Sequence, residues 1–384
     1  MLNQDLPEQN IALYIHFPFC RRKCNYCSFV SYTSRDTDII AYLGVLKKEI
    51  VLRATDKHIN TIYFGGGTPS LLSNEQVEDI LSTIGSLNII NKAAEITMEA
   101  NPGTVDTSYL TAIRKSGINR LSLGIQSLND SELTLLGRIH TAAESREVVL
   151  LARNAGFTNL NIDLIYGIPQ QTVSQWRAIL AEAIELNPEH ISLYPLTLDG
   201  NEPLYHKIER GELPALNPDI SAEQYELAED LLANHGYQHY EISNWAKEGY
   251  ECKHNLVYWQ NLPYLGIGVA AHSYLDNHRL ANTSDLDQYL SKFYSNVKWV
   301  IDWEEEIDSK LQLAESVILG LRLSQGVSLN EIHGRFGIDL LSQYSSQVDH
   351  LAGLGLLEQT KSHMRLTRRG RLLGNEVFHQ FLPA

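Results

Sequence analysis

The sequence predicts an α/β fold whose main part is a partial (β/α)6 TIM-like barrel over residues 1–200. An appended α+β region at 201–305 and a C-terminal winged-helix-like domain at 306–384 are expected to follow it. Three observations support this organisation. Short β-rich runs recur about every 25 to 40 residues, amphipathic segments separate them, and the alternation stops near residue 200. Such alternation is typical of repeated βα units around a parallel sheet.

The barrel elements can be placed in order along the chain. The predicted strands occupy 11–17, 61–67, 95–100, 120–126, 160–167 and 190–196. The predicted helices occupy 42–54, 75–85, 108–117, 143–156 and 173–186. Six strands are too few for the eight of a complete TIM barrel, but the same rule should apply, and chemistry should gather at the C-terminal ends of the strands.

The two regions after the barrel have different patterns. A helix is predicted at 223–236, and the segment 239–274 is expected to lie against the open side of the barrel. From about residue 310, three helices and a Gly-bounded two-strand wing indicate a winged helix. DNA binding is the alternative that this domain raises, but residues 311–384 hold seven Lys and Arg against six Asp and Glu. This charge cannot neutralise several phosphates, so we expect a docking or lid role over the barrel.

Composition limits the partners of the protein. The net charge of −15 and the isoelectric point near 5.4 argue against a broad contact with nucleic acid or anionic lipid, since such partners need clustered Lys and Arg. The first residues, MLNQDLPEQN, lack the apolar segment of a signal peptide, and no run of about 18 apolar residues occurs. We therefore expect a cytoplasmic protein with no nucleic-acid partner.

Three of the four cysteines lie in the segment 20–27, CRRKCNYC, directly after the first predicted strand. Thiols stay reduced in the cytoplasm, so a tight cysteine cluster favours a metal or catalytic site over disulfides. A structural zinc site usually takes four ligands, and this Cys-x3-Cys-x2-Cys motif has no second pair. An iron–sulfur cube held by three thiolates leaves one iron open to another ligand. Cys252 stands alone and is expected to be a buried apolar thiol.

The spacing of Cys20, Cys24 and Cys27 resembles the cluster motif of the radical S-adenosylmethionine family. The resemblance covers nearly the whole chain and implies a [4Fe-4S] cluster on these three cysteines. In that family the open iron chelates the amino and carboxylate groups of S-adenosyl-L-methionine. This would explain why the motif has three thiols and not four.

The glycine-rich run 65–69, GGGTP, directly follows the second predicted strand, where missing side chains let the backbone approach a ligand closely. It resembles the family motif that meets the methionyl amino group. Resemblance to the coproporphyrinogen-oxidase-like subfamily implies contacts to a cluster-bound and to a second S-adenosylmethionine. The first set is Tyr14, Tyr26, Gly66 and Glu99, and the second is Gly67, Thr68, Gln126, Arg138 and Asp163. From the residues alone, Glu99 and Asp163 could instead cap the helices after their strands, and Arg138 could be a surface residue.

Two features distinguish haem handling from porphyrinogen oxidation within this subfamily. The segment 254–259, HNLVYW, resembles the HNxxYW motif of HemW-type haem chaperones, which implies that His254 is a haem ligand flanked by aromatic side chains. The alternative is a core histidine in an aromatic-rich segment. Coproporphyrinogen oxidases place a further cysteine two residues after the third ligand, where this chain has Phe29, and they have a longer N-terminal arm than the 19 residues before Cys20.

The resemblance implies a chaperone that binds haem and transfers it to acceptor haemoproteins, such as membrane respiratory enzymes, from the cytoplasm with transient membrane association. The cluster and S-adenosylmethionine would support that role, and coproporphyrinogen oxidation is not expected. A homodimer is compatible with the resemblance, although no residue pattern indicates one. The alternative is a true oxygen-independent coproporphyrinogen III oxidase, which decarboxylates propionates through a 5′-deoxyadenosyl radical.

Overall fold

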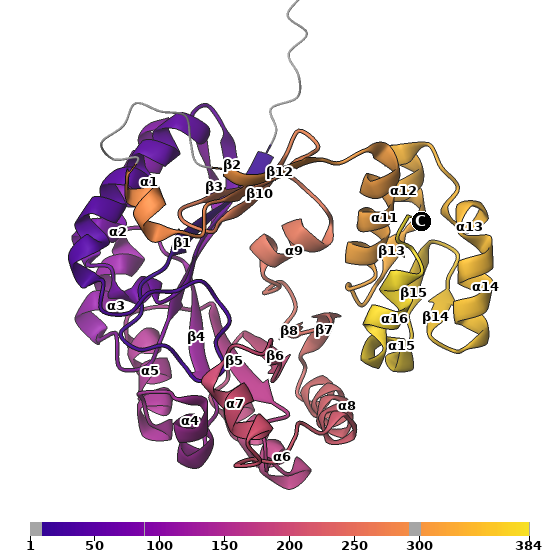
Figure 1. Ribbon diagram of the computed structural model, residues 1–384, viewed down its shortest axis with the longest axis horizontal. Coiled ribbons are helices and arrows are strands. Elements are labelled where there is room, and N and C mark those ends of the chain that lie inside the picture. The colour runs from indigo at the N-terminus through magenta and orange to yellow at the C-terminus, as the bar shows by residue number, and fades with distance from the viewer. Residues whose placement is uncertain (1–9, 88, 292–300, 384) are drawn as a thin grey trace, which may run out of the picture.

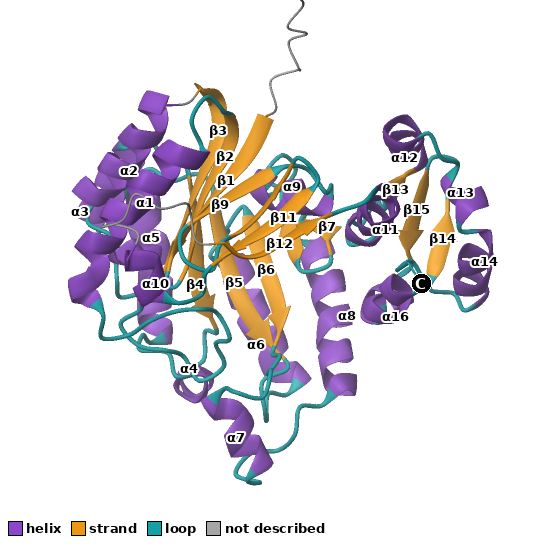
Figure 2. Cartoon of the chain, turned by 45° about the horizontal axis from the view of Figure 1, so that its top comes forward, coloured by secondary structure: helices purple, strands orange, loops and turns teal. Residues whose placement is uncertain are grey.

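A large curved sheet is the frame of the computed structural model, which describes residues 10–87, 89–291 and 301–383 (Figure 1, Figure 2). Six parallel strands form its centre in chain order. They are β1 (Asn10–Phe17), β2 (His58–Gly66), β3 (Ile89–Ala100), β4 (Arg120–Gln126), β5 (Leu160–Tyr166) and β6 (His190–Pro195). The six β-rich runs of the sequence therefore form the expected parallel strands.

Helices cover the outer face of this sheet (Figure 1). The expected ones are α1 (Ile39–Arg53), α2 (Asn74–Leu87), α3 (Thr107–Lys115), α5 (Ala142–Asn154) and α6 (Val173–Glu185). The side chains of Thr141 and Thr172 cap α5 and α6 in capping boxes. A further short helix, α4 (Asp130–Leu136), precedes α5. The periodicity does not predict α4, because seven residues give too few turns for a clear amphipathic pattern.

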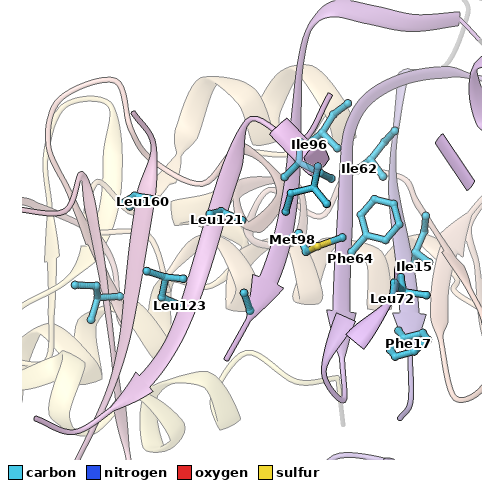
Figure 3. Packing of buried hydrophobic residues seen from close by; sticks show 14 of the residues in the cluster. Ile15, Phe17, Ile62, Phe64, Leu72, Ile96, Met98, Leu121, Leu123 and Leu160 are labelled. Carbon is cyan, nitrogen blue, oxygen red and sulfur yellow. The ribbon is translucent and has the colours of Figure 1, made fainter. Parts of the chain in front are cut away.

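The two faces of the parallel strands differ in polarity because side chains alternate along a strand. Phe64, Met98 and Leu123 point to the outer face and are fully buried in the main hydrophobic core (Figure 3). Their neighbours Glu99 and Ser122 lie on the inner face. This alternation keeps apolar packing under the helices and leaves polar side chains lining the interior of the curve.

The region after residue 200 differs from the expectation, since it extends the sheet at both edges instead of only lying against the open side. Its strands join β1 on one edge through β9 and join β6 on the other through β8. The helices are α7 (Pro203–Glu209), α8 (Pro218–Asn234), α9 (Lys253–Trp259) and α10 (Leu286–Ser291). The strands are β7 (Gln238–Glu241), β8 (Asn244–Ala246), β9 (Tyr264–Ile267), β10 (His272–Leu275), β11 (His278–Asn282) and β12 (Ile301–Glu306). Only α9 lies between the two edges, where it packs on β2 (Figure 1).

The C-terminal part has its own hydrophobic core and a three-stranded sheet. Its helices are α11 (Ser309–Gly320), α12 (Leu329–Phe336), α13 (Leu340–Gln343), α14 (Ser345–Gly353), α15 (Arg368–Leu372) and α16 (Gly374–His379). The expected wing is the hairpin of β14 (Leu357–Gln359) and β15 (His363–Leu366), to which the short β13 (Val327–Ser328) adds a third strand. The pairing of β13 is missed from the sequence because two residues carry no strand pattern.

The basic segment 365–371 of this domain faces acidic residues of the same chain. Arg368 contacts Glu229 at 3.0 Å and Asp230 at 2.8 Å, and Arg371 contacts Glu229 at 2.7 Å. Both acidic residues belong to α8. These arginines therefore pair the domain with α8, and none of the domain's described residues lines the pocket at the strand ends.

Candidate functional site

A pocket of about 350 Å³ opens at the C-terminal ends of the parallel strands. Eleven of the thirteen residues predicted for the cluster, S-adenosylmethionine or haem line it. They are Cys20, Cys24, Tyr26, Cys27, Gly66, Gly67, Thr68, Glu99, Gln126, Arg138 and Asp163. The other two, Tyr14 and His254, lie further back, on the middle of β1 and on α9. The topology therefore brings together residues that are up to 143 positions apart in sequence, from Cys20 to Asp163.

The cysteine loop, residues 20–27, is tied to two distant elements (indigo in Figure 1). The backbone N–H of Asn25 donates to Leu136 O at 2.9 Å, and its side-chain amide donates to Leu135 O at 2.9 Å. Its carbonyl accepts from the N–H of Leu204 at 3.0 Å. Asn25 thus fastens the middle of the loop to the end of α4 and the start of α7, which holds the thiols over the strand ends.

The three thiols of the loop suit thiolate ligands of an iron–sulfur cluster. All three are free and partly buried, and burial raises the pKa of Cys20 and of Cys27. The Thr68 hydroxyl donates to Cys20 Sγ and Arg138 Nη1 donates to Cys24 Sγ, each at 3.4 Å. Such donors stabilise thiolate charge. Within the described ranges no three His, Cys, Asp or Glu side chains are arranged to hold a single metal ion. A cube bonds each thiolate to a different iron, so its ligands need to line one cavity and not to meet at one point.

The glycine-rich run packs too tightly for side chains. Gly66 has a φ of +112°, and a Cβ there would lie 2.6 Å from the ring of His16. A Cβ on Gly67 would lie 2.7 Å from Phe19 O. The N–H of Gly67 donates to Phe17 O at 2.8 Å. Glycine is therefore required where this turn passes the end of β1 and borders the pocket.

Glu99 is aimed into the pocket and does not cap a helix. Its carboxylate accepts from Tyr63 Oη at 3.0 Å and from the N–H of Gly66 at 3.2 Å. Burial, together with the nearby charge of Asp163, raises the pKa of Glu99 to about 7. The N-cap of α3 is Asp106, so the capping alternative does not hold for Glu99. A buried carboxylate of this kind can accept hydrogen bonds from an ammonium group or a hydroxyl pair.

Asp163 and Gln126 lie on neighbouring strands of the same pocket. Asp163 accepts from Ser122 Oγ at 2.9 Å and from Asn161 Nδ2 at 2.8 Å, and burial raises its pKa. Thr172, and not Asp163, caps α6. Gln126 ends β4 with a φ of +68°, a conformation that is unusual for a residue with a side chain and that occurs at functional sites.

Asn101 is a pocket residue that does not belong to the predicted ligand contacts. Its Oδ1 accepts from Arg138 Nη2 at 2.5 Å, and its Nδ2 donates to Thr68 Oγ1 at 3.1 Å. Arg138 also donates to Gly124 O at 2.7 Å, so it is a fixed pocket residue and not a mobile surface side chain. Asn101 therefore links the two donors that reach two different thiols. Its position two residues after Glu99, at the end of β3, is the signal that could have identified it.

His254 is enclosed by hydrogen bonds and aromatic rings. It is only 1% exposed. Its Nδ1 lies 2.8 Å from Thr61 Oγ1 and its Nε2 lies 2.9 Å from Tyr258 Oη. The ring of Tyr63 lies 5.1 Å away between centroids, and burial lowers the pKa of His254 to about 3. In this conformation His254 is a hydrogen-bonded core histidine, as the alternative interpretation of the segment supposes.

The start of α9 is held by a carboxylate from the sheet. Glu95 of β3 accepts from the N–H groups of Lys253 and His254, each at 3.2 Å, and from the thiol of Cys252 at 3.5 Å. It satisfies helix N–H groups that have no partner within the helix. Cys252 is fully buried, which confirms the expectation that it is a core thiol. Tyr14 lies beside this group, with its ring 6.4 Å from that of His254.

Comparisons with known proteins identify the family. Residues 14–183 match the Radical SAM superfamily and residues 307–373 match the HemN C-terminal domain. The Heme chaperone HemW of Lactococcus lactis subsp. lactis (strain IL1403) is 36% identical, over 97% of this chain and 97% of that protein. The chain belongs to the HemW family. The family member of Bacillus subtilis (strain 168) is 35% identical over 97% of this chain and 99% of its own length, and that of Escherichia coli (strain K12) is 33% identical over 97% and 98%.

The HemW family also shares its fold with a solved structure of a porphyrinogen oxidase. Coproporphyrinogen III oxidase (HemN) from Escherichia coli, a Radical SAM enzyme, matches with a TM-score of 0.86 and 26% identity, over 98% of this chain and 91% of that one. The expected radical S-adenosylmethionine fold is thereby confirmed. Members of this superfamily generally use a [4Fe-4S] cluster and S-adenosylmethionine. Among the helices that the structure describes, none is both long and apolar enough to cross a membrane.

Proposed function

We propose that this chain is a haem chaperone that holds a [4Fe-4S] cluster and S-adenosylmethionine and passes haem to acceptor haemoproteins. The observation that carries the proposal is the single pocket lined by three cysteines and eight other predicted residues, in a chain of the HemW family. The relatives named Heme chaperone HemW support haem as the cargo.

The pocket residues take separate roles in this proposal. Cys20, Cys24 and Cys27 bind the cluster, whose open iron would chelate the amino and carboxylate groups of S-adenosylmethionine. Glu99 accepts hydrogen bonds from the bound nucleoside or its ammonium group. Arg138 and Thr68 donate to the thiolates, as they do to the thiols in the structure.

The remaining predicted contacts surround this centre. The glycine-rich run lets the backbone approach the methionyl group, and Gly67, Thr68, Gln126, Arg138 and Asp163 would surround a second S-adenosylmethionine. Tyr26, within the cysteine loop, packs against a small hydrophobic cluster of Leu136, Ile165, Ile168, Leu196 and Leu204. Tyr14, the remaining predicted contact, lies behind the pocket lining, with its ring stacked on that of Tyr63.

His254 is the proposed axial haem ligand, and the structure sets a condition on that role. Both ring nitrogens are engaged, Nδ1 with Thr61 Oγ1 and Nε2 with Tyr258 Oη, so one of these hydrogen bonds must break before a nitrogen lone pair is free for iron. The proposed ligand therefore depends on an opening of α9.

Haem titration tests the chaperone proposal most directly. Purified full-length protein is titrated with haem and followed by Soret absorbance, beside His254→Ala and Cys24→Ser. We expect saturable binding by the wild type, weaker binding by His254→Ala, and loss of the cluster absorbance near 400 nm without loss of haem binding in Cys24→Ser. Absence of haem binding by the wild type would refute the proposal.

A coproporphyrinogen III oxidase is the second candidate, because the fold matches HemN over nearly the whole chain. Phe29 argues against this candidate, because the oxidases have a further cysteine at its position. Its side chain is 67% exposed and lines the pocket. Anaerobic incubation of reconstituted protein with coproporphyrinogen and S-adenosylmethionine decides between the two. We expect no protoporphyrinogen, and turnover would replace the chaperone proposal with the oxidase.

The place of action and the acceptors are part of the same proposal. We infer a cytoplasmic protein that meets membrane respiratory haemoproteins transiently. Mixing haem-loaded protein with the apo form of such an enzyme, in detergent, should move the Soret band to the acceptor. Size-exclusion chromatography with light scattering at several concentrations shows whether a homodimer forms.

A further inference from the structure

Three large apolar or aromatic side chains expose surface in the cluster pocket, and the hydroxyl of one of them, Tyr194, lies near the buried carboxylates of Asp163 and Glu99. Phe29 is 67% exposed, Ile139 is 53% exposed and Tyr194 is 41% exposed, and all three line the pocket. They come from three separate segments, which are the stretch just after the cysteine loop, the loop after α4 and the end of β6. Large apolar side chains that converge on one opening are typical of a ligand-binding surface and are costly to leave in water.

Three consecutive cations lie on the same rim. Arg21, Arg22 and Lys23 are exposed and line the pocket, although the whole chain carries a net charge of −15. Arg21 Nη1 donates to Gly103 O at 3.3 Å, and Lys23 Nζ donates to Phe29 O at 3.5 Å. Both contacts are to backbone carbonyls, so neither positive charge is neutralised by them. The acidic residues of the pocket, Glu99 and Asp163, are buried at its floor and not at this rim.

A rim that combines apolar side chains with cations fits a flat, apolar ligand with negatively charged edges. Haem has this chemistry, since its macrocycle is apolar and its two propionates are anionic. We propose that haem docks across the mouth of the cluster pocket. Its ring lies against Phe29, Ile139 and Tyr194, and its propionates face Arg21, Arg22 and Lys23. This inference rests on the proposed chaperone function and adds a site that the HNxxYW motif does not include.

The other places for haem in this conformation are less suitable. His254 is 1% exposed and both its ring nitrogens have partners. A second cavity of about 400 Å³ lies beside Trp259, but its charged lining residues are one cation, Arg335, and one anion, Glu331. Neither place offers both an exposed apolar surface and an excess of positive charge.

The rim also explains how a docked haem would relate to the cluster. The cations precede Cys24 directly and Phe29 follows Cys27 by two residues, so the loop that binds the cluster would also contact the cargo. Haem at this position would cover the opening of the pocket and reduce the access of water to the cluster.

A charge-matched pair of triple variants tests the cation side of the proposal. Arg21→Gln/Arg22→Gln/Lys23→Gln removes three positive charges from the rim. The control, Lys92→Gln/Lys115→Gln/Lys310→Gln, removes three from exposed positions outside the pocket. Haem is titrated into full-length protein with reconstituted cluster under argon. We expect the rim variant to bind haem about tenfold more weakly, with a shallower dependence of affinity on salt, and the control to change less than about twofold.

A second pair tests the apolar side. Tyr194→Ser lies on β6, outside the cysteine loop, and its control Ile40→Ser lies on α1, where the native side chain is 80% exposed. Tyr194→Ser should weaken haem binding by about fivefold, on the scale of a covered aromatic side chain, and Ile40→Ser should not. Because Tyr194 is not in the loop, this result stands even if the rim glutamines reduce the iron content.

The outcomes separate this inference from the proposed function. If the wild type binds no haem, both the chaperone proposal and the proposed docking surface fail. If the wild type binds haem while Tyr194→Ser and the rim triple match their controls, the docking surface is overturned and the chaperone proposal stands. If, in that case, His254→Ala abolishes haem binding, haem binds at α9.

Discussion

The cluster pocket and helix α9 both carry family motifs, yet they differ in access. Eleven predicted residues line one open pocket, whereas the motif histidine on α9 is 1% exposed and fully hydrogen-bonded. The pocket residues sit at the ends of parallel strands, where topology alone makes side chains converge. His254 sits on a helix, and its surroundings depend on what that helix packs against, which here is Glu95 and Thr61. A motif on a strand end therefore predicts a site more directly than one on a packed helix.

The largest effect is expected from removing the carboxylate that holds α9. Glu95→Ala removes the acceptor of the helix N–H groups of Lys253 and His254, and it removes one of the carboxylates whose charge acts on Arg120, which is 1% exposed. Breaking such a buried arrangement costs roughly 3–5 kcal/mol. For a chain of this size the melting temperature should fall by about 5 °C.

Thermal unfolding followed by circular dichroism measures this change, with Glu78→Ala on the exposed side of α2 as the control. An unchanged melting temperature in Glu95→Ala would mean that α9 does not depend on Glu95. The burial of His254 could then not be attributed to the contacts that Glu95 makes with the start of α9.

The buried carboxyl group of Glu99 in the pocket should make the free energy of unfolding depend on pH. Burial raises the pKa of Glu99 to about 7 from an ordinary value of 4.5, so the folded state holds a proton that the unfolded state has released between these values. Stability contributed by the protonated group is thus lost as pH rises from about 4.5 through 7. Integrated over this window, the loss is roughly 3 kcal/mol.

Glu99→Gln should therefore reduce the loss of stability between pH 5 and pH 8 by roughly 3 kcal/mol, measured by urea unfolding of the protein without cofactors. Glu241→Gln is the matched control, since burial also raises the pKa of Glu241 to about 7 but this residue lies outside the pocket lining. The control should show a similar pH effect without altering S-adenosylmethionine binding. Identical curves for Glu99→Gln and the wild type would contradict the assigned carboxyl environment.

The same contrast explains what could be predicted from the sequence. Strand and helix periodicity predicts the βα units, and the strand-end rule with the family motifs predicts the pocket lining. Pairing of segments far apart, such as β9 with β1 and β8 with β6, carries no local signal and is missed. Asn101 and Glu95 are missed for a related reason. Each acts through partners on other elements, Arg138 for Asn101 and the start of α9 for Glu95, and these contacts exist only in the folded chain.

A smaller effect, on haem affinity, is expected from removing the hydrogen bond between Tyr258 and His254. Tyr258→Phe removes the hydroxyl 2.9 Å from His254 Nε2 and leaves the aromatic packing in place. If His254 binds haem, loss of this competing hydrogen bond, worth about 1 kcal/mol, should raise haem affinity by about fivefold. Tyr264→Phe, whose ring packs on that of Tyr258, is the control. Unchanged affinity in Tyr258→Phe would favour the pocket mouth as the main haem site.

The smallest effect, on the reduction potential of the cluster, is expected from removing the side chain that supports Arg138 and Thr68. Asn101→Ala removes the amide that joins Arg138 to Thr68, so the two donors to the thiols lose their common support. Hydrogen bonds to cluster ligands stabilise the reduced, more negative cluster, and weakening them should lower its reduction potential. A redox titration of reconstituted protein followed by electron paramagnetic resonance measures this shift, with Asn91→Ala at an exposed position as the control. A potential equal to that of the control would show that Arg138 and Thr68 keep their orientation without Asn101, and that the loop alone sets the environment of the cluster.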